Sequence, residues 1–143
     1  MRLEDDHHCF ACGSLNNSGL KLKFHLDKEK KSIFTEFTPK KIHQGFKDIV
    51  HGGILGLILD ECMVNLAWRL GMHAVSAEYT IKLINPAATG KKLTFSAQII
   101  SENTRMLAVS GKCVDEEGIN IASSSSKCIK IKRQAGFQGP DRL

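Results

Sequence analysis

The chain has 143 residues and a formal net charge of +5, and 42% of its residues are hydrophobic and 24% charged. This length and composition are typical of one ordinary soluble domain, which needs no disulfide framework to bury a core. The longest apolar run, Ile54 to Leu59, is far shorter than the roughly 20 residues of a transmembrane helix, so a membrane span is excluded.

The positive charge is scattered along the chain. "KEKK" (28–31) has the composition of a turn, and "KCIKIKR" (127–133) alternates like the outer face of a strand. No helix-turn-helix or aromatic–basic RNA motif accompanies these lysines, so nucleic acid is not expected as a partner. A small polyanionic ligand is compatible with the charge.

The first residues, "MRLEDDHHCF", are acidic where a secretory signal would be basic, and no apolar core follows them. The five cysteines lack a regular spacing beyond Cys9 and Cys12. An odd, irregular set of this kind favours free thiols in a reducing compartment. We therefore expect a cytoplasmic protein.

A zinc site is the alternative for the N-terminal cysteines. His7, His8, Cys9 and Cys12 include a C-x-x-C pair with neighbouring histidines, which are ligands that zinc prefers. A structural zinc site usually has a second pair at a regular distance, and the sequence has none. We expect no metal, and we expect Cys9, Phe10 and Cys12 to pack as small apolar groups under the sheet.

The next two segments predict an antiparallel hairpin. Residues 19–26, "GLKLKFHL", place leucines and a phenylalanine at every second position, which is typical of a half-buried strand. Residues 32–38, "SIFTEFT", continue the alternation until Pro39 ends it.

Residues 52–70 change to a helical pattern, which Gly71 ends as a C-terminal cap. Apolar side chains lie on nearly every side of this helix, so sheet has to wrap it. Four further strands are predicted at 74–84, 92–100, 105–114 and 119–132, joined by short turns. The order predicts an α+β fold, a curved antiparallel β-sheet wrapped around one long central helix. We expect a single domain over residues 1–143, with a loose tail from about residue 134.

Two adjacent carboxylates interrupt the apolar helix. Asp60 has apolar neighbours one turn before and after it, so its charge is costly unless it is paired or its pKa rises toward the range of a general base. A purely structural buried aspartate is the alternative. Glu61 instead forms a polar stripe with Asn65 and Arg69, which we expect to meet a partner subunit or solvent.

Four motifs in the right order resemble one known family. They are "CFACGSLNNSGLKLKF" from Cys9, "HQGFKDIVHGG" from His43, the helix signature His51-Gly52-Gly53 with Asp60 nine positions after the histidine, and "INPAATGKKL" from Ile84. The sequence resembles the hotdog-fold acyl-CoA thioesterases, specifically the phenylacetate-type (PaaI-like) group. The resemblance covers Cys9 to Ile131.

This resemblance implies an enzyme that hydrolyses an acyl-CoA thioester without a cofactor. It places a general base or nucleophile at Asp60, with Glu61 as the reserve candidate, and oxyanion donors at Gly52 and Gly53 at the start of the helix. In the preceding loop, Gln44 corresponds to a polar residue that positions substrate or water. The resemblance also suggests that His51 orients the loop or the substrate. Basic residues near the hairpins are candidates for contacts with coenzyme A: Lys91, Arg105 and Lys112.

The rival hypothesis is a non-catalytic hotdog module that binds acyl-CoA as a sensor or carrier. A dehydratase is disfavoured, because no hydratase signature is present. The eight helical steps from Gly52 to Asp60 span about 12 Å, too far for both to act on one carbonyl. We therefore expect a homodimer, or a dimer of dimers, in which one chain supplies the donors and the other the carboxylate.

Overall fold

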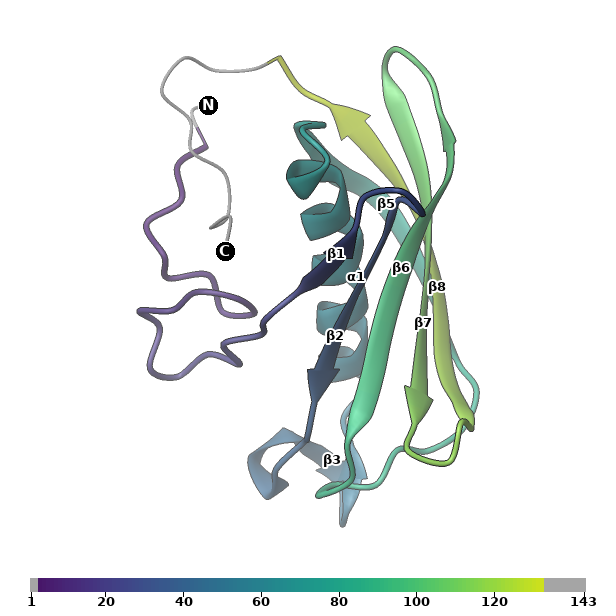
Figure 1. The fold of residues 1–143 in the computed structure, drawn as a ribbon. Helices are drawn as coiled ribbons and strands as arrows, with labels where there is room; N and C mark the ends of the chain where they lie inside the picture. The colour runs from purple at the N-terminus through teal and green to yellow at the C-terminus, as the bar shows by residue number, and fades with distance from the viewer. Residues whose placement is uncertain (1–2, 133–143) are drawn as a thin grey trace.

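The computed structural model of the protein describes residues 3–132. One antiparallel sheet has the strand order β1-β2-β6-β7-β8-β5, and helix α1 packs against one face of it (Figure 1). The elements are β1 (His25–Asp27), β2 (Ser32–Phe37), η1 (Lys41–His43), β3 (Gln44–Phe46), β4 (Ile49–Val50), α1 (Gly52–Arg69), β5 (Ala74–Leu83), β6 (Leu93–Glu102), β7 (Met106–Asp115) and β8 (Asn120–Lys130). The predicted α+β fold is confirmed, and the predicted tail lies outside the described residues.

Helix α1 begins and ends close to the predicted positions. His51 is its N-cap and Leu70 its C-cap, and Gly71 follows with φ +80°, the left-handed conformation that glycine adopts without strain. Its buried face includes Ile58, Leu59 and Leu66. No helix within residues 3–132 has both the length and the apolar character needed to cross a lipid bilayer.

The hydrophobic core lies between α1 and the sheet. The helix contributes its buried aliphatic side chains, and β6 and β7 contribute Leu93, Phe95, Leu107 and Val109, each at most 1% exposed. Full burial of each such side chain is worth about 1.5–3 kcal/mol. Alternate residues of β7 and of the first half of β6 point into this core, so these two strands pack directly against α1.

The N-terminal segment differs from the prediction. Only the end of the expected first strand, His25–Asp27, pairs with β2. The N–H groups of Leu20 and Leu22 instead donate to the carbonyls of Phe10 and Ala11, at 2.8 and 2.9 Å. The predicted inward face is nevertheless right for Leu22, which is buried. Alternation indicates which side chains are buried, but not which segment the backbone pairs with.

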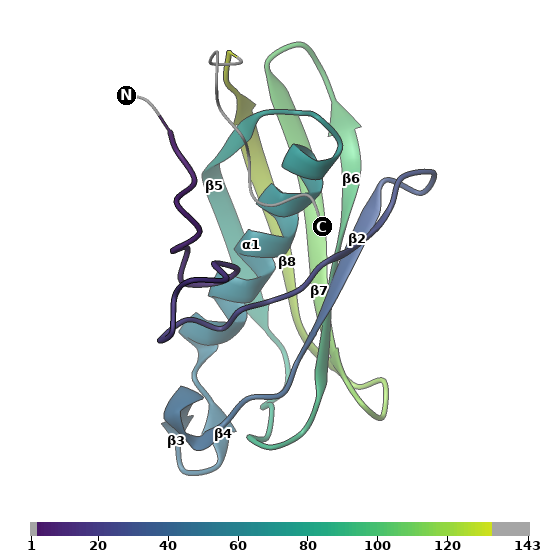
Figure 2. The ribbon, with the colours of Figure 1, turned by 60° about the vertical axis from the view of Figure 1, so that its left-hand side comes forward.

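The expected packing of the N-terminal cysteines under the sheet is wrong. Cys9 is exposed, Phe10 is 45% exposed and Cys12 is half-buried, whereas Ala11 between them is buried. The segment lies on the side of α1 that faces away from the sheet, as two views show (Figures 1 and 2). The small Ala11 methyl enters the core, Cys12 packs only against its margin, and the Cys9 side chain is exposed. All five cysteines are free thiols, as predicted.

Strand β5 is an edge of the sheet. It pairs with β8 on one side only, with a bulge between Ser76 and Glu78. Three large apolar side chains on and just after it are about half exposed: Tyr79, Leu83 and Ile84. A long edge with exposed apolar side chains is a surface on which another strand can pair.

Candidate functional site

The loop before α1 is held by a short hairpin. Gln44 lies in β3, and its side-chain Oε1 accepts a hydrogen bond from the N–H of Asp48 at 3.2 Å. The N–H of His51 donates to the carbonyl of His43 at 2.9 Å, which fixes the entry into the helix. A Cβ at Gly45 would lie 3.2 Å from Cα of His51, a tight contact that favours glycine there. Sequence reasoning did not single out Gly45.

His51 caps the helix with its imidazole. Its Nδ1 accepts from the N–H of Gly53 at 2.9 Å, and its carbonyl accepts from the N–H of Ile54 at 2.9 Å. Within the described residues, the N–H of Gly52 has no partner. The helix start therefore presents one open donor, and the Gly53 donor becomes available when the imidazole turns away. Open N–H groups at a helix N-terminus stabilise negative charge.

The two glycines at the helix start have different surroundings. A Cβ at Gly52 would lie 2.6 Å from Cδ1 of Leu83, so a side chain there would require the exposed Leu83 side chain to move. Gly53 is exposed, and a Cβ there would meet only the ring of His51, at 3.0 Å from Nδ1. The backbone at Gly53 is thus accessible from outside.

Asp60 is anchored from β5. Its Oδ1 accepts a hydrogen bond from Oγ of Ser76 at 2.6 Å, and the aspartate is half-buried. A short hydrogen bond to a carboxylate is among the stronger ones in proteins. Ser76 lies beside the bulge of β5, and the sequence contains no signal for this contact because the bulge sets which β5 side chain faces the helix.

Glu61 points to a different neighbour. Its Oε1 accepts from Nδ2 of Asn65 at 2.7 Å and lies 3.8 Å from Sγ of Cys9, while Oδ1 of Asn65 accepts from Nε of Arg69 at 3.3 Å. Within one chain, the N-terminal segment contacts Glu61, and Asn65 is buried, whereas Arg69 is half-buried and lines a pocket. Contact of this polar stripe with a partner subunit stays a prediction. The two adjacent carboxylates do have separate environments.

The Glu61 region is electrostatically unusual. Burial raises the pKa of Glu61 to about 7. A hydrogen bond from the Cys12 thiol lowers the pKa of Cys9 to about 5, and the same hydrogen bond, together with burial, raises the pKa of Cys12. The three side chains therefore form one electrostatically coupled cluster.

The three basic residues suggested for coenzyme A are not brought together within one chain. Lys91 precedes β6 and Arg105 follows it, and this strand of 10 residues is about 33 Å long. Lys112 is an exposed residue of β7 between two buried ones, so it lies on the face of the sheet that is turned away from α1.

The helix start and Asp60 are also separate within one chain. Asp60 lies eight helical residues after Gly52, about 12 Å along the axis. Within one chain, the open N–H of Gly52 and the carboxylate of Asp60 are therefore too far apart to contact the same small chemical group.

One family model matches this chain. The model described as the thioesterase superfamily matches residues 47–122, just over half of the chain, from the hairpin before the helix into β8. The chain belongs to the thioesterase superfamily. The start of α1 and Asp60 both lie within the residues that match the superfamily model. No curated protein matches it.

Solved structures confirm the hotdog fold of this thioesterase-superfamily chain. The PaaI protein of the E. coli phenylacetic acid degradation operon aligns with a TM-score of 0.72 at 21% identity, covering 79% of this chain and 81% of that one. A hypothetical thioesterase from Streptococcus pneumoniae TIGR4, solved with coenzyme A, aligns with a TM-score of 0.77 at 14% identity, covering 91% and 98%.

Another similar structure is smu.793 from Streptococcus mutans UA159, bound to acetyl-CoA, with a TM-score of 0.72 at 15% identity and coverage of 85% and 99%. Two further structures of the S. pneumoniae protein carry single alanine replacements, one of an aspartate and one of a threonine.

Proposed function

We propose that the protein is an acyl-CoA thioesterase in which Asp60 acts as general base or nucleophile. The observation that carries this proposal is the anchoring of Asp60 by Ser76, at 2.6 Å, on a helix that begins with two glycines and an open N–H group. Membership of the thioesterase superfamily supports the reaction class. The two streptococcal proteins solved with coenzyme A and acetyl-CoA support the substrate class.

In the general-base route, Asp60 takes a proton from water, and the water oxygen attacks the thioester carbonyl. The N–H groups at a helix start stabilise the oxyanion. The carbon–sulfur bond then breaks, the leaving sulfur takes a proton, and the products are a carboxylic acid and free coenzyme A. In the nucleophile route, the Asp60 carboxylate attacks the carbonyl, the carbon–sulfur bond breaks and the coenzyme A sulfur leaves and takes a proton. Water then hydrolyses the resulting mixed anhydride, which releases the carboxylic acid and regenerates Asp60. Both routes need the Ser76 hydrogen bond to orient the carboxylate.

The proposal includes a homodimer with shared sites. The β5 edge is unpaired within the described chain and exposes Tyr79 and Leu83. Two copies related by a two-fold axis can join along this edge, with their α1 helices antiparallel. The donors at Gly52 and Gly53 of one chain then approach Asp60 of the other, which removes the separation of about 12 Å within one chain.

The S. pneumoniae thioesterase offers a parallel for the Asp60–Ser76 pair. The aspartate and the threonine that were replaced in it are 16 positions apart, with the aspartate first. Asp60 and Ser76 have the same separation of 16 and are joined by a hydrogen bond here. A hydroxyl side chain at this spacing supports a role of the pair in the proposed reaction.

The non-catalytic acyl-CoA module is the second candidate, and one observation favours it. The N–H of Gly53 is already bound by His51 at 2.9 Å, which leaves fewer donors for an oxyanion. Such a module would bind acyl-CoA without turning it over.

A panel of aromatic, short-chain and long-chain acyl-CoAs separates the two candidates. Hydrolysis is followed by the loss of thioester absorbance, because Cys9 is exposed and would react with a thiol reagent. We expect turnover of at least one class, and a loss of kcat of about 100-fold or more in Asp60→Asn. Binding without turnover, or an Asp60→Asn variant with near wild-type kcat, would reject catalysis by Asp60.

A further inference from the structure

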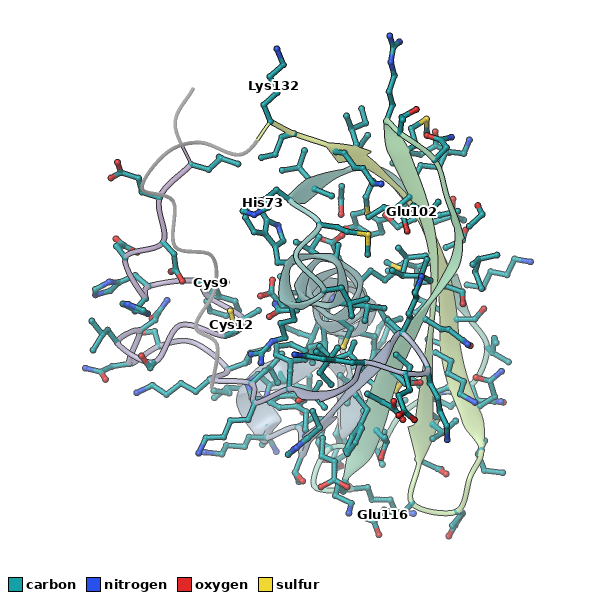
Figure 3. All side chains as sticks on the ribbon, turned by 45° about the horizontal axis from the view of Figure 1, so that its top comes forward. Cys9, Cys12, His73, Glu102, Glu116 and Lys132 are labelled. Atoms are coloured by element: carbon teal, nitrogen blue, oxygen red, sulfur yellow. The ribbon has the colours of Figure 1, made fainter. Side chains whose placement is uncertain are left out.

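The two N-terminal cysteines lie beside a third candidate metal ligand, a glutamate that is distant in sequence. Sγ of Cys9, Sγ of Cys12 and a carboxylate oxygen of Glu61 all lie within 4.8 Å of one another. Figure 3 shows the two cysteines next to each other on the segment beside α1. The sequence offers no second pair of zinc ligands at a regular distance from the two cysteines, but the fold brings Glu61 of the helix beside them.

A tight turn holds the two thiols on the same side. The N–H of Gly13 donates to the carbonyl of Cys9 at 2.8 Å, which closes the turn around Cys12. A Cβ at Gly13 would lie 2.5 Å from both the N of Cys9 and the carbonyl oxygen of His7, so only glycine fits. Ala11 anchors the turn in the core. The C-x-x-C spacing together with this turn is the arrangement that structural zinc sites use.

We propose that Cys9, Cys12 and Glu61 bind a zinc ion that fastens the N-terminal segment to helix α1. Tetrahedral zinc with Zn–S of about 2.3 Å and Zn–O of about 2.1 Å places its ligand atoms about 3.5–3.8 Å apart. The distance of 3.8 Å between Sγ of Cys9 and Oε1 of Glu61 already meets this requirement. The fourth ligand is a water molecule, which can reach Cys12 from the adjoining cavity of about 480 Å³.

The surroundings of Glu61 fit a ligand role. Nδ2 of Asn65 donates to the glutamate at 2.7 Å, which orients the carboxylate as second-shell partners of metal ligands do. Arg69 in turn holds Asn65. Two thiolates and one carboxylate carry three negative charges, which a divalent cation reduces to one. Binding releases the thiol protons and stabilises the folded state of the N-terminal segment.

Cobalt and zinc titrations test the site. The full chain is reduced, stripped with a chelator and titrated anaerobically with Co²⁺, which gives a thiolate-to-cobalt charge-transfer band when cysteines coordinate it; Zn²⁺ then displaces the cobalt. We expect one ion per chain. Cys9→Ser and Cys12→Ser should each weaken binding at least about 100-fold, and Glu61→Gln about 10-fold or more. Far-ultraviolet circular dichroism verifies that each variant is folded, which is expected at least for the exposed Cys9.

Two matched controls sharpen the result. Asp60→Asn changes the adjacent carboxylate, which faces Ser76 instead, and should bind zinc like the wild type. His8→Gln removes a nearby imidazole that is held by the carbonyl of Asp6, and it should also retain zinc. The proposal is overturned if reduced protein binds neither ion more tightly than about 10 μM, if the double cysteine variant keeps its metal, or if Glu61→Gln binds as tightly as Asp60→Asn.

Discussion

Asp60 and Glu61 are neighbours in sequence but belong to different parts of the molecule. Ser76 of the sheet edge holds Asp60, while Asn65 and the N-terminal cysteines surround Glu61. Successive helical residues point about 100° apart, so adjacent carboxylates can serve separate sites. We propose that Asp60 takes part in the reaction and that Glu61 binds the zinc ion.

Ser76 should act as a positioning residue for Asp60. In Ser76→Ala the carboxylate loses a charge-assisted hydrogen bond, and we expect kcat to fall about 10-fold with KM nearly unchanged. Ser76→Thr keeps the hydroxyl and should restore most of kcat. Steady-state kinetics of both variants measure this. Equal loss in Ala and Thr variants would mean that packing at the bulge matters rather than the hydrogen bond.

At the scale of the elements, the start of α1 combines a cap with an open donor. The imidazole of His51 accepts from Gly53, and the chain enters through a hairpin held by Gln44. The cap stabilises the helix while it occupies one of the donors that the proposed reaction needs. His51 is therefore placed to affect both stability and turnover.

Replacing His51 should separate these two effects. His51→Ala removes the cap and should lower the free energy of unfolding by about 1 kcal/mol, which lowers Tm by roughly 3–5 °C. Asparagine also caps helices, so His51→Asn should recover most of this stability. Thermal denaturation followed by circular dichroism measures both. An unchanged Tm in His51→Ala would show that the hydrogen bond to Gly53 contributes nothing to folding.

Most elements were predictable because their patterns are local. The helix and strands β5 to β8 begin and end within about two residues of the predicted positions, since helical periodicity, alternation and the glycine at 71 are read along the chain. Contacts between distant segments were not predictable. Ser76 reaches Asp60 because of a bulge, and Cys9 reaches Glu61 because residues 20–22 pair with the preceding loop. Neither arrangement has a sequence period.

At the scale of the whole molecule, the β5 edge is where a second copy would join. The edge exposes Tyr79, and the residues that follow the strand are also apolar. In an isologous interface every substitution occurs twice, so a charge placed there meets its own copy.

Tyr79→Lys should therefore weaken the dimer. The two lysines repel each other and the aromatic contact is lost, and we expect the dissociation constant to rise about 10-fold or more. Ile100→Lys is the control, because Ile100 is 63% exposed on the inner strand β6. Sedimentation velocity over a dilution series measures both. The β5 interface would be rejected if both variants dissociated alike, or if the wild type were monomeric.

The most direct test of the account is recovery of activity in mixed dimers. Inactive Asp60→Asn chains and inactive Gly53→Val chains are unfolded and refolded together; Gly53 is exposed, so its variant should fold. With shared sites, each mixed dimer has both lesions in one site and a wild-type pair in the other. Random pairing makes half of the dimers mixed, so acyl-CoA hydrolysis should return to about a quarter of the wild-type rate. If native mass spectrometry shows mixed dimers, both variants are folded and the mixture is still inactive, the site does not combine Asp60 of one chain with the helix start of the other.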